Sequence, residues 1–157
     1  MWKVSSPAFG QGEAIPAEHT CTGIDRSPEL AWTKPPDGTR SLALLVDDPD
    51  APDPAAPTRV WVHWIRYNIP PRRESLPEGA GNAPPEDGSL DARTDAGSTG
   101  YHGPCPPVGT HRYFFRLFAL DTMLPDLGPD ADRREFERAT AGHVLATAEL
   151  MGTFLKA

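Results

Sequence analysis

The sequence between residues 60 and 69 reads Val-Trp-Val-His-Trp-Ile-Arg-Tyr-Asn-Ile, and prolines follow at positions 70 and 71. β-Branched and aromatic residues fill this stretch, which is the composition that strands prefer. Proline fixes φ and has no N–H to donate, so the two prolines end the strand. Residues 60–69 are therefore the strongest predicted strand of the chain, and they favour a β-rich fold.

Three more strands are predicted on either side of it. Residues 41–47 form a short apolar run that halts at Asp48-Pro49. Residues 113–120 alternate between two faces of a pleat, and residues 29–32 form a shorter candidate. Proline-rich turns separate these segments, which is typical of antiparallel β-sandwiches.

The C-terminal third mixes helix and strand signals. Residues 130–139 carry acidic residues in the first turn and no proline after it, which predicts one helix. Residues 143–155 contain helix formers, yet every second residue from Val144 to Phe154 would share one face of a strand. Local propensity leaves both conformations open for this segment.

Composition limits the class of protein. The chain has 157 residues, a length typical of one domain, and we expect a single domain over residues 1–157. Its 15 basic and 22 acidic residues give a net charge of −7, which disfavours nucleic acid as a partner because phosphates are bound by basic patches. The 19 prolines rule out long helical bundles. We find no apolar run of membrane-spanning length and no signal-peptide pattern, so we expect no integral membrane contact and a cytoplasmic location.

The chain has two cysteines, Cys21 and Cys105, and neither lies in a metal-binding spacing. In a reducing compartment free thiols are the expected state, although a disulfide between the two stays open. We expect no metal and no cofactor.

The sequence contains no nucleotide-loop motif and no hydrolase motif. Four polar residues at or within the predicted strands stand out instead. Asp48 ends the first strand, His63 lies within the aromatic strand, and His111 and Tyr113 open the third. If these strands are neighbours, the four side chains converge. The irregular segment between residues 69 and 111 is a second place to look for a site, because such long loops are commonly functional.

Each of these residues also has a structural interpretation. An Asp before Pro is a common turn residue. His63 fits a core or surface histidine, and His111 with Tyr113 fits the polar start of a strand. The residues alone leave both interpretations open.

Three motifs follow one another along the chain: Asp47-Asp48-Pro49-Asp50-Ala51-Pro52, then Val62-His63-Trp64, then Gly103-Pro104-Cys105-Pro106-Pro107 with His111-Arg112-Tyr113. Together they resemble the signature of the phosphatidylethanolamine-binding proteins. The resemblance is closest to the bacterial and archaeal Raf-kinase-inhibitor-like branch of that family, because flanking stretches such as Ser6-Pro7-Ala8-Phe9 and Thr20-Cys21 also match.

That resemblance implies a mainly β fold: an antiparallel β-sandwich with a small anion pocket at one end and one or two short helices near the C-terminus. It also implies that the chain after the helix returns as a strand. The residues it assigns to the pocket come from three strands and one loop: Asp48, His63, Gly103, Pro104, Pro106, Pro107, His111 and Tyr113. His102 stands where the family commonly has glycine and adds an imidazole near the mouth, and the segment 108–110 is short for the family.

The pocket residues suit an anion. Imidazoles and the Tyr113 hydroxyl can donate to phosphate oxygens, and Asp48 can hold a histidine in one tautomer. We expect His63 and His111 to bind as imidazolium, so that affinity for sulfate rises as the pH falls from about 8 to 6. Cys105, in the pocket loop, is expected near the site.

Two functions follow as hypotheses. The first is a small-molecule binding or regulatory protein for phosphate-type groups, phosphorylated headgroups or carboxylates, without turnover; a regulated protein partner and a homodimer stay open. The alternative is a hydrolase in which Asp48, His63 and His111 hold a metal ion or act as acid and base.

Overall fold

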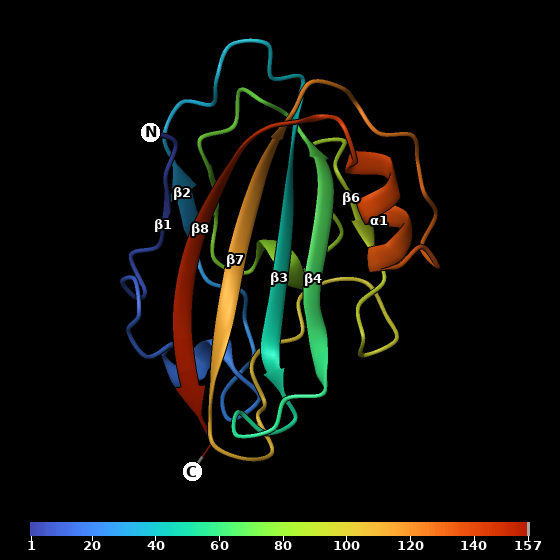
Figure 1. Cartoon of the computed structure of the whole chain (residues 1–157). Coiled ribbons are helices and arrows are strands. Elements are labelled where there is room, and N and C mark those ends of the chain that lie inside the picture. Colours follow the sequence, from blue (N-terminus) through green and yellow to red (C-terminus); the bar gives the residue numbers. More distant parts are fainter. Residues whose placement is uncertain (157) are drawn as a thin grey trace.

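The computed structural model describes residues 1–156, whose strands form two antiparallel sheets. The larger sheet has five strands in the order β6-β4-β3-β7-β8, and the smaller has the order β1-β2-β5 (Figure 1). The strands are β1 Val4–Ser5, β2 Leu30–Trp32, β3 Ser41–Ala51, β4 Arg59–Ile69, β5 Ser75–Leu76, β6 Leu90–Ala92, β7 Thr110–Leu120 and β8 Val144–Leu155. The helical elements are the 3₁₀ turns Ala17–His19 and Ala80–Asn82 and the helix α1, Arg133–Thr140.

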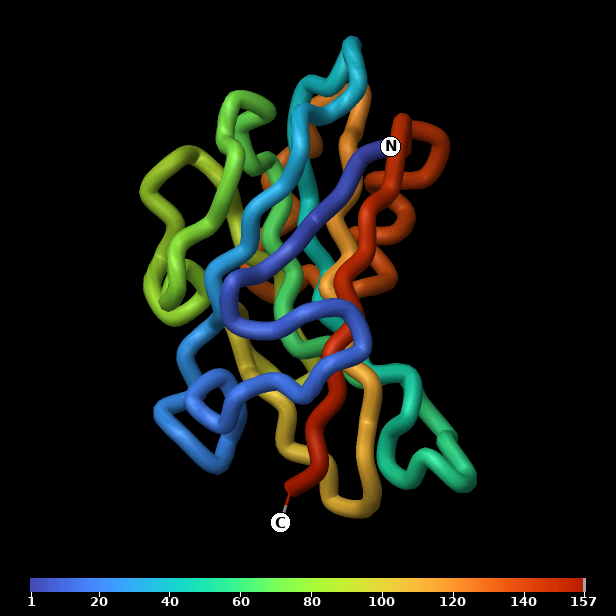
Figure 2. Tube along the Cα trace, turned by 90° about the vertical axis from the view of Figure 1, so that its left-hand side faces the viewer, coloured from blue at the N-terminus to red at the C-terminus, as the bar shows by residue number. Residues whose placement is uncertain are grey.

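Two apolar clusters cover the two faces of the larger sheet. One lies between the sheets and includes Leu30 of β2, Trp64 of β4 and Phe115 of β7. The other lies beneath α1, where Phe136 packs against Phe118 of β7. Figure 2 shows the N-terminal strands and α1 on opposite sides of the larger sheet. The predicted antiparallel β-sandwich with a helix near the C-terminus is therefore confirmed.

The three central strands are longer than the apolar patterns predict. β3 continues from residue 47 to Ala51, and β7 begins at Thr110 rather than at residue 113. Both extensions lie at the same end of the sheet, where polar and proline residues follow the apolar runs. Pairing with neighbouring strands holds them, and the irregular register between Asp48 and Ala51 accommodates Pro49.

The helix begins later than predicted because of its cap. Asp132 accepts a hydrogen bond from the backbone N–H of Arg134 at 2.9 Å, and the side chain of Glu135 accepts one from the backbone N–H of Asp132 at 3.0 Å. This capping box satisfies N–H groups that have no partner within the helix, so α1 starts at Arg133.

The ambiguous C-terminal segment is a strand. β8 pairs with β7 from Thr110↔Leu155 to Leu120↔Val144. A long neighbouring strand with an open edge supplies the hydrogen bonds that local propensity cannot anticipate. This confirms the returning strand that the resemblance implies. Within residues 1–156, no helix has the length and apolarity needed to cross a membrane.

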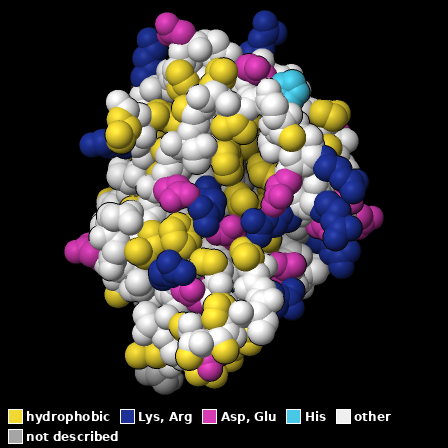
Figure 3. Space-filling model, in the orientation of Figure 1, with side chains coloured by type: hydrophobic (Ala, Val, Ile, Leu, Met, Phe, Trp, Pro, Cys, Tyr) yellow, Lys and Arg dark blue, Asp and Glu magenta, His cyan; other side chains and the backbone are white. Residues whose placement is uncertain are grey.

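Acidic and basic side chains lie beside one another across the face shown in Figure 3. Arg116 of β7 contacts both Asp47 of β3 and Glu149 of β8, and Arg133 of α1 lies 3.7 Å from Asp47. Burial raises the pKa of Asp47, while Arg116 opposes that effect. Asp47 is therefore the buried member of an ion-pair network on the face opposite the small sheet.

Candidate functional site

Three neighbouring strands bring the sequence-predicted polar residues together. β3 lies between β4 and β7, so Asp48, His63, His111 and Tyr113 meet at the end of the sheet where β3 terminates. Side chains alternate across a strand, and Asp48 therefore points away from the face that Asp47 occupies. All four residues line one cavity of about 610 Å³. The convergence expected from the sequence is confirmed.

A bulge presents His63 to this cavity. Val46 pairs with Trp64 and Asp47 pairs with Val62, so His63 has no partner residue on β3. An extra residue of this kind re-aims its side chain and strengthens the local twist. No pattern in the sequence marks the position of the bulge.

Loops close the cavity at the lower end of the molecule in Figure 1, where segments from residues 20–26, 51–59 and 100–110 gather. Gly103, Pro106 and Pro107 line it as predicted. Pro104 is buried in the same loop and is not among the lining residues; its carbonyl oxygen accepts a hydrogen bond from the backbone N–H of Cys21 at 3.1 Å.

Asp48 and His111 form a buried pair. The Nδ1 atom of His111 lies 2.6 Å from Oδ2 of Asp48, and Oδ1 of Asp48 accepts a hydrogen bond from the backbone N–H of Asp50 at 2.8 Å. The other ring nitrogen of His111 lies 2.8 Å from the Val108 carbonyl and 3.1 Å from the Pro52 carbonyl. Both ring nitrogens therefore contact acceptors of the protein itself, and neither is free to donate to a ligand or to bind a metal.

His63 behaves differently. Its Nδ1–H donates to the backbone carbonyl of His102 at 2.5 Å. Its Nε2 atom is buried and has no hydrogen-bond partner within residues 1–156. Burial lowers the pKa of His63 to about 4, although the His102 carbonyl and Asp48 oppose the shift. At neutral pH the ring is therefore uncharged, and Nε2 presents a lone pair rather than a proton.

The hydroxyl of Tyr113 is the second unpartnered group in the cavity. It is buried without a hydrogen-bond partner in the described part of the chain, and its ring meets that of His63 edge-on at 5.3 Å between centroids. Burial, together with the nearby Asp48 carboxylate, raises the pKa of Tyr113 well above its ordinary value. Tyr113 is therefore a neutral hydroxyl that can donate.

Several lining residues were not identified from the sequence as site residues. The guanidinium of Arg59 lies 4.5 Å from the ring centroid of Trp61, and both residues line the cavity. Asp25 has a left-handed φ of 59° and accepts hydrogen bonds from the backbone N–H of Gly103 at 3.1 and 3.3 Å. Burial raises the pKa of Asp25. Arg59 and Trp61 lie at the start of β4, and Asp25 lies in a loop whose path depends on tertiary contacts.

The cysteines form a disulfide. Cys21 and Cys105 are joined across an 84-residue separation with their Cα atoms 5.4 Å apart, so the expected free thiols are not found. Both cysteines line the cavity, which places Cys105 at the site as predicted. The pairing brings together two loops that are distant in sequence, and only the fold reveals their proximity.

The metal-dependent form of the alternative hydrolase finds no support in the arrangement of the described side chains. Within residues 1–156, no three His, Cys, Asp or Glu side chains are placed to hold a metal ion. The contacts of His111 explain this for the residues named in that hypothesis, because its two nitrogens already face Asp48 and backbone carbonyls.

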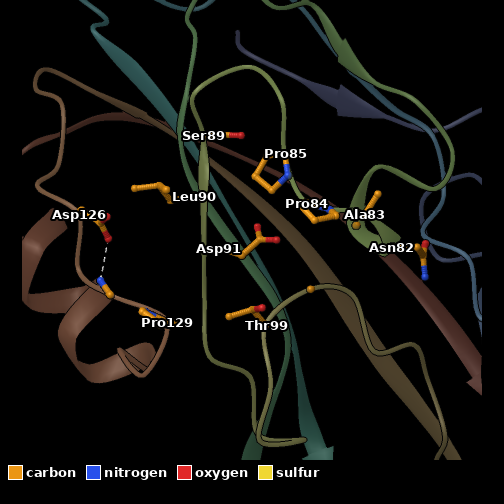
Figure 4. A pocket seen from close by; sticks show the side chains of 13 residues that line it. Asn82, Ala83, Pro84, Pro85, Ser89, Leu90, Asp91, Thr99, Asp126 and Pro129 are labelled. Atoms are coloured by element: carbon orange, nitrogen blue, oxygen red, sulfur yellow. Dashed lines mark hydrogen bonds between the residues drawn. The ribbon is translucent and has the colours of Figure 1, made fainter.

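A second cavity, of about 530 Å³, lies beside β6 (Figure 4). Its carboxylates are already engaged: Asp91 receives two hydrogen bonds from Arg66, at 2.8 and 3.0 Å, and Asp126 accepts one from the backbone N–H of Gly128 at 2.9 Å. Among the described residues, three buried polar groups have no hydrogen-bond partner: His63 Nε2 and the Tyr113 hydroxyl line the first cavity, and Trp64 Nε1 lines neither. The first cavity is therefore the candidate site.

Acid is expected to destabilise the protein through His63. Its pKa is about 4 when folded and about 6.5 when unfolded, so the unfolded chain binds the extra proton first. The contribution is fully present above about pH 6.5 and is lost as the pH falls toward 4, by about 2–3 kcal/mol. Urea unfolding at pH 7.5 and 4.5 measures it. The His63→Gln variant should lose less stability over the same interval, and equal losses in the two proteins would contradict the assignment.

Comparisons with known proteins agree with this fold. The family model for phosphatidylethanolamine-binding protein matches residues 5–155. A protein from Methanothermobacter thermautotrophicus is 48% identical over 150 residues, which cover 94% of each chain. The solved structure of a phosphatidylethanolamine-binding protein homologue from Chlamydia trachomatis has a TM-score of 0.88 at 38% identity and covers 99% of this chain and 98% of its own. Escherichia coli YbcL has a TM-score of 0.89 at 31% identity, covering 99% of both chains. The chain therefore belongs to the phosphatidylethanolamine-binding protein family.

Proposed function

We propose that the cavity binds small organic phosphomonoesters in their singly protonated form, as a binding protein without turnover. One observation carries the proposal: His63 Nε2 and the Tyr113 hydroxyl are both buried, both lack a partner in the described residues, and both line the same cavity. A buried polar group without a partner costs free energy, so a ligand that satisfies both is favoured.

The two groups call for different atoms of the ligand. Neutral His63 accepts at Nε2, and Tyr113 donates its hydroxyl proton. A singly protonated phosphate has both complements, because its P–OH group donates and its charged oxygens accept. The proposed ligand is still an anion, as expected from the sequence. The group that binds it differs, because His63 acts as a neutral acceptor and not as an imidazolium donor.

The charges lining the cavity favour one negative charge over two. Arg59 supplies a positive charge at the lining; its side chain is about half exposed and lies 3.8 Å from Asp95. Two carboxyl groups, those of Asp25 and Asp48, also line the cavity. The oxygens of Asp48 are engaged by His111 and the Asp50 N–H. A doubly charged phosphate would meet that carboxylate more unfavourably than a singly charged one.

The volume argues for an organic group on the phosphate. A cavity of about 610 Å³ exceeds what one phosphate fills, and its apolar lining includes Pro52, Trp61 and Pro106. Phenyl phosphate is therefore a suitable probe, with sulfate as a reference anion that carries no proton.

The pH dependence tests this proposal by calorimetry. The second pKa of a phosphomonoester lies near 6, so phenyl phosphate should bind about 50-fold more tightly at pH 6 than at pH 8, the ratio of its singly protonated fractions. Sulfate needs a proton on His63, whose pKa is about 4, so its binding should stay weak over this interval. Phenyl phosphate affinity that is equal at the two pH values, or sulfate affinity that rises in parallel, would overturn the mechanism.

Two variants locate the ligand. Tyr113→Phe and His63→Gln should each weaken phenyl phosphate binding at pH 6 by about tenfold or more, the effect of losing a hydrogen bond to a charged group. His143→Gln is the matched control, because His143 is half exposed and pairs with Asp121 outside this cavity. Unchanged affinity in both pocket variants would place the ligand elsewhere.

A further inference from the structure

The Cys21–Cys105 disulfide forms part of the cavity wall. Both cysteines line the cavity, and both are exposed, so a reductant in solution can reach the sulfur atoms. No other cysteines are present in the chain. An accessible disulfide in the wall of a ligand pocket is a candidate point of control over that pocket.

Few noncovalent contacts accompany the disulfide where it joins its two loops. The backbone N–H of Cys21 donates to the Pro104 carbonyl at 3.1 Å, and Asp25 accepts from the N–H of Gly103. The Tyr101 hydroxyl donates to the His19 carbonyl at 2.7 Å. The disulfide is therefore the covalent member of a small set of contacts that holds the 101–107 loop in place.

The same loop orients His63. The backbone N–H of His102 donates to the His63 carbonyl at 2.9 Å, and Nδ1 of His63 donates to the His102 carbonyl. His102 lies three residues before Cys105. A shift of the loop at Cys105 is thus transmitted to the contact that fixes the tautomer and direction of the His63 ring.

We propose that the redox state of Cys21–Cys105 regulates the pocket: reduction by a dithiol weakens phosphomonoester binding, and a bound phosphomonoester in turn protects the disulfide from reduction. This inference rests on the function proposed above. Coupling between two sites is reciprocal, so the factor by which reduction weakens binding equals the factor by which the ligand disfavours reduction.

The position of Lys156 indicates which cysteine leaves first when a dithiol reduces the disulfide by thiol–disulfide exchange. Its Nζ atom lies 4.0 Å from Sγ of Cys105, where an ammonium group stabilises a departing thiolate. One thiolate of the dithiol attacks Sγ of Cys21, the S–S bond breaks, and Cys105 leaves as a thiolate. The second thiolate of the reductant then attacks the reductant's first sulfur atom in the mixed disulfide. This closes the disulfide of the oxidised reductant and releases the Cys21 thiolate. Two electrons pass from the dithiol to the protein, and water supplies the protons.

The test measures phenyl phosphate affinity at pH 6 in the oxidised protein and in protein reduced with dithiothreitol. We expect reduction to weaken binding by about fivefold or more, the lower range of coupling between sites. The Cys21→Ser/Cys105→Ser variant should bind as weakly as the reduced protein and should not respond to dithiothreitol. Hydrogen exchange should quicken in residues 20–26 and 101–107 on reduction, while β3 and β7 stay protected and show that the fold persists.

The outcomes separate this inference from the function on which it rests. Equal phenyl phosphate affinity in both redox states, or unchanged exchange in the two loops, would overturn the regulation and leave the proposed function standing. No phenyl phosphate binding in either state would overturn both. Lys156→Gln should slow reduction severalfold, and an unchanged rate would overturn the assignment of Cys105 as the leaving thiolate.

Discussion

The Asp48→Ala variant is expected to unfold with a free energy about 3–5 kcal/mol lower than that of the unaltered protein, the cost of breaking a buried pair by removing one partner. Asp48 is 3% exposed and His111 is fully buried. Loss of the carboxylate leaves Nδ1 of His111 and the backbone N–H of Asp50 without the acceptor they now contact.

Urea unfolding at pH 7.5 measures this effect, and Glu149→Gln provides the control. Glu149 also pairs with a basic residue of β7, but its side chain is 44% exposed, and such exposed pairs contribute about 1 kcal/mol or less. If Asp48→Ala lowers the free energy of unfolding by no more than Glu149→Gln does, the Asp48–His111 contact does not support the fold.

The Gly103→Val variant is expected to lose about 3 kcal/mol of stability and most of its affinity for phenyl phosphate, because this position has no room for a side chain. A Cβ atom at Gly103 would lie 2.1 Å from Oδ1 of Asp25 and 2.4 Å from the carbonyl oxygen of His19. The Asp25 side chain can turn away, but the His19 carbonyl belongs to the backbone of the 3₁₀ turn Ala17–His19. The 101–107 loop must therefore move as a unit, and His63 loses its contact with His102.

Thermal unfolding and calorimetry on the same sample measure both effects. Val108→Ala is the control, since Val108 directly follows this loop, is 53% exposed and does not line the cavity, and its replacement should change stability by about 0.5 kcal/mol or less. Wild-type affinity in a folded Gly103→Val protein would contradict the role given to this loop in the pocket.

Much of the fold follows from local patterns. The apolar runs that predict strands at residues 41–47, 60–69 and 113–120 all lie in β3, β4 and β7, because alternation and β-branched composition reflect burial within a sheet. Local patterns fail at the strand ends. There, β3 and β7 continue through polar residues, and pairing with β4 and β8 holds these ends in register.

The C-terminal segment shows the same limit. Residues 143–155 fit a helix or a strand by composition, and β8 is extended because β7 offers it a full-length partner. The resemblance to a family resolved this case, since a family carries information about pairing that one sequence does not.

The candidate site divides in a similar way. The identities of Asp48, His63, His111 and Tyr113 were readable from motifs, and the structure places all four at one cavity. Their roles were not readable. His111 was expected to donate to a ligand, yet its nitrogens face Asp48 and two backbone carbonyls. Such contacts come from strands and loops far apart in the chain.

The sequence by itself determined the class of fold, the positions of the central strands along the chain, and which polar residues stand at the ends of those strands. These features depend on short-range periodicity and on residue chemistry. Only the tertiary structure decided that His63 is neutral, that the cysteines are joined, and that both ring nitrogens of His111 face acceptors of the protein itself. Each of these depends on burial or on the approach of distant segments, because desolvation and disulfide formation are set by what surrounds a residue in space.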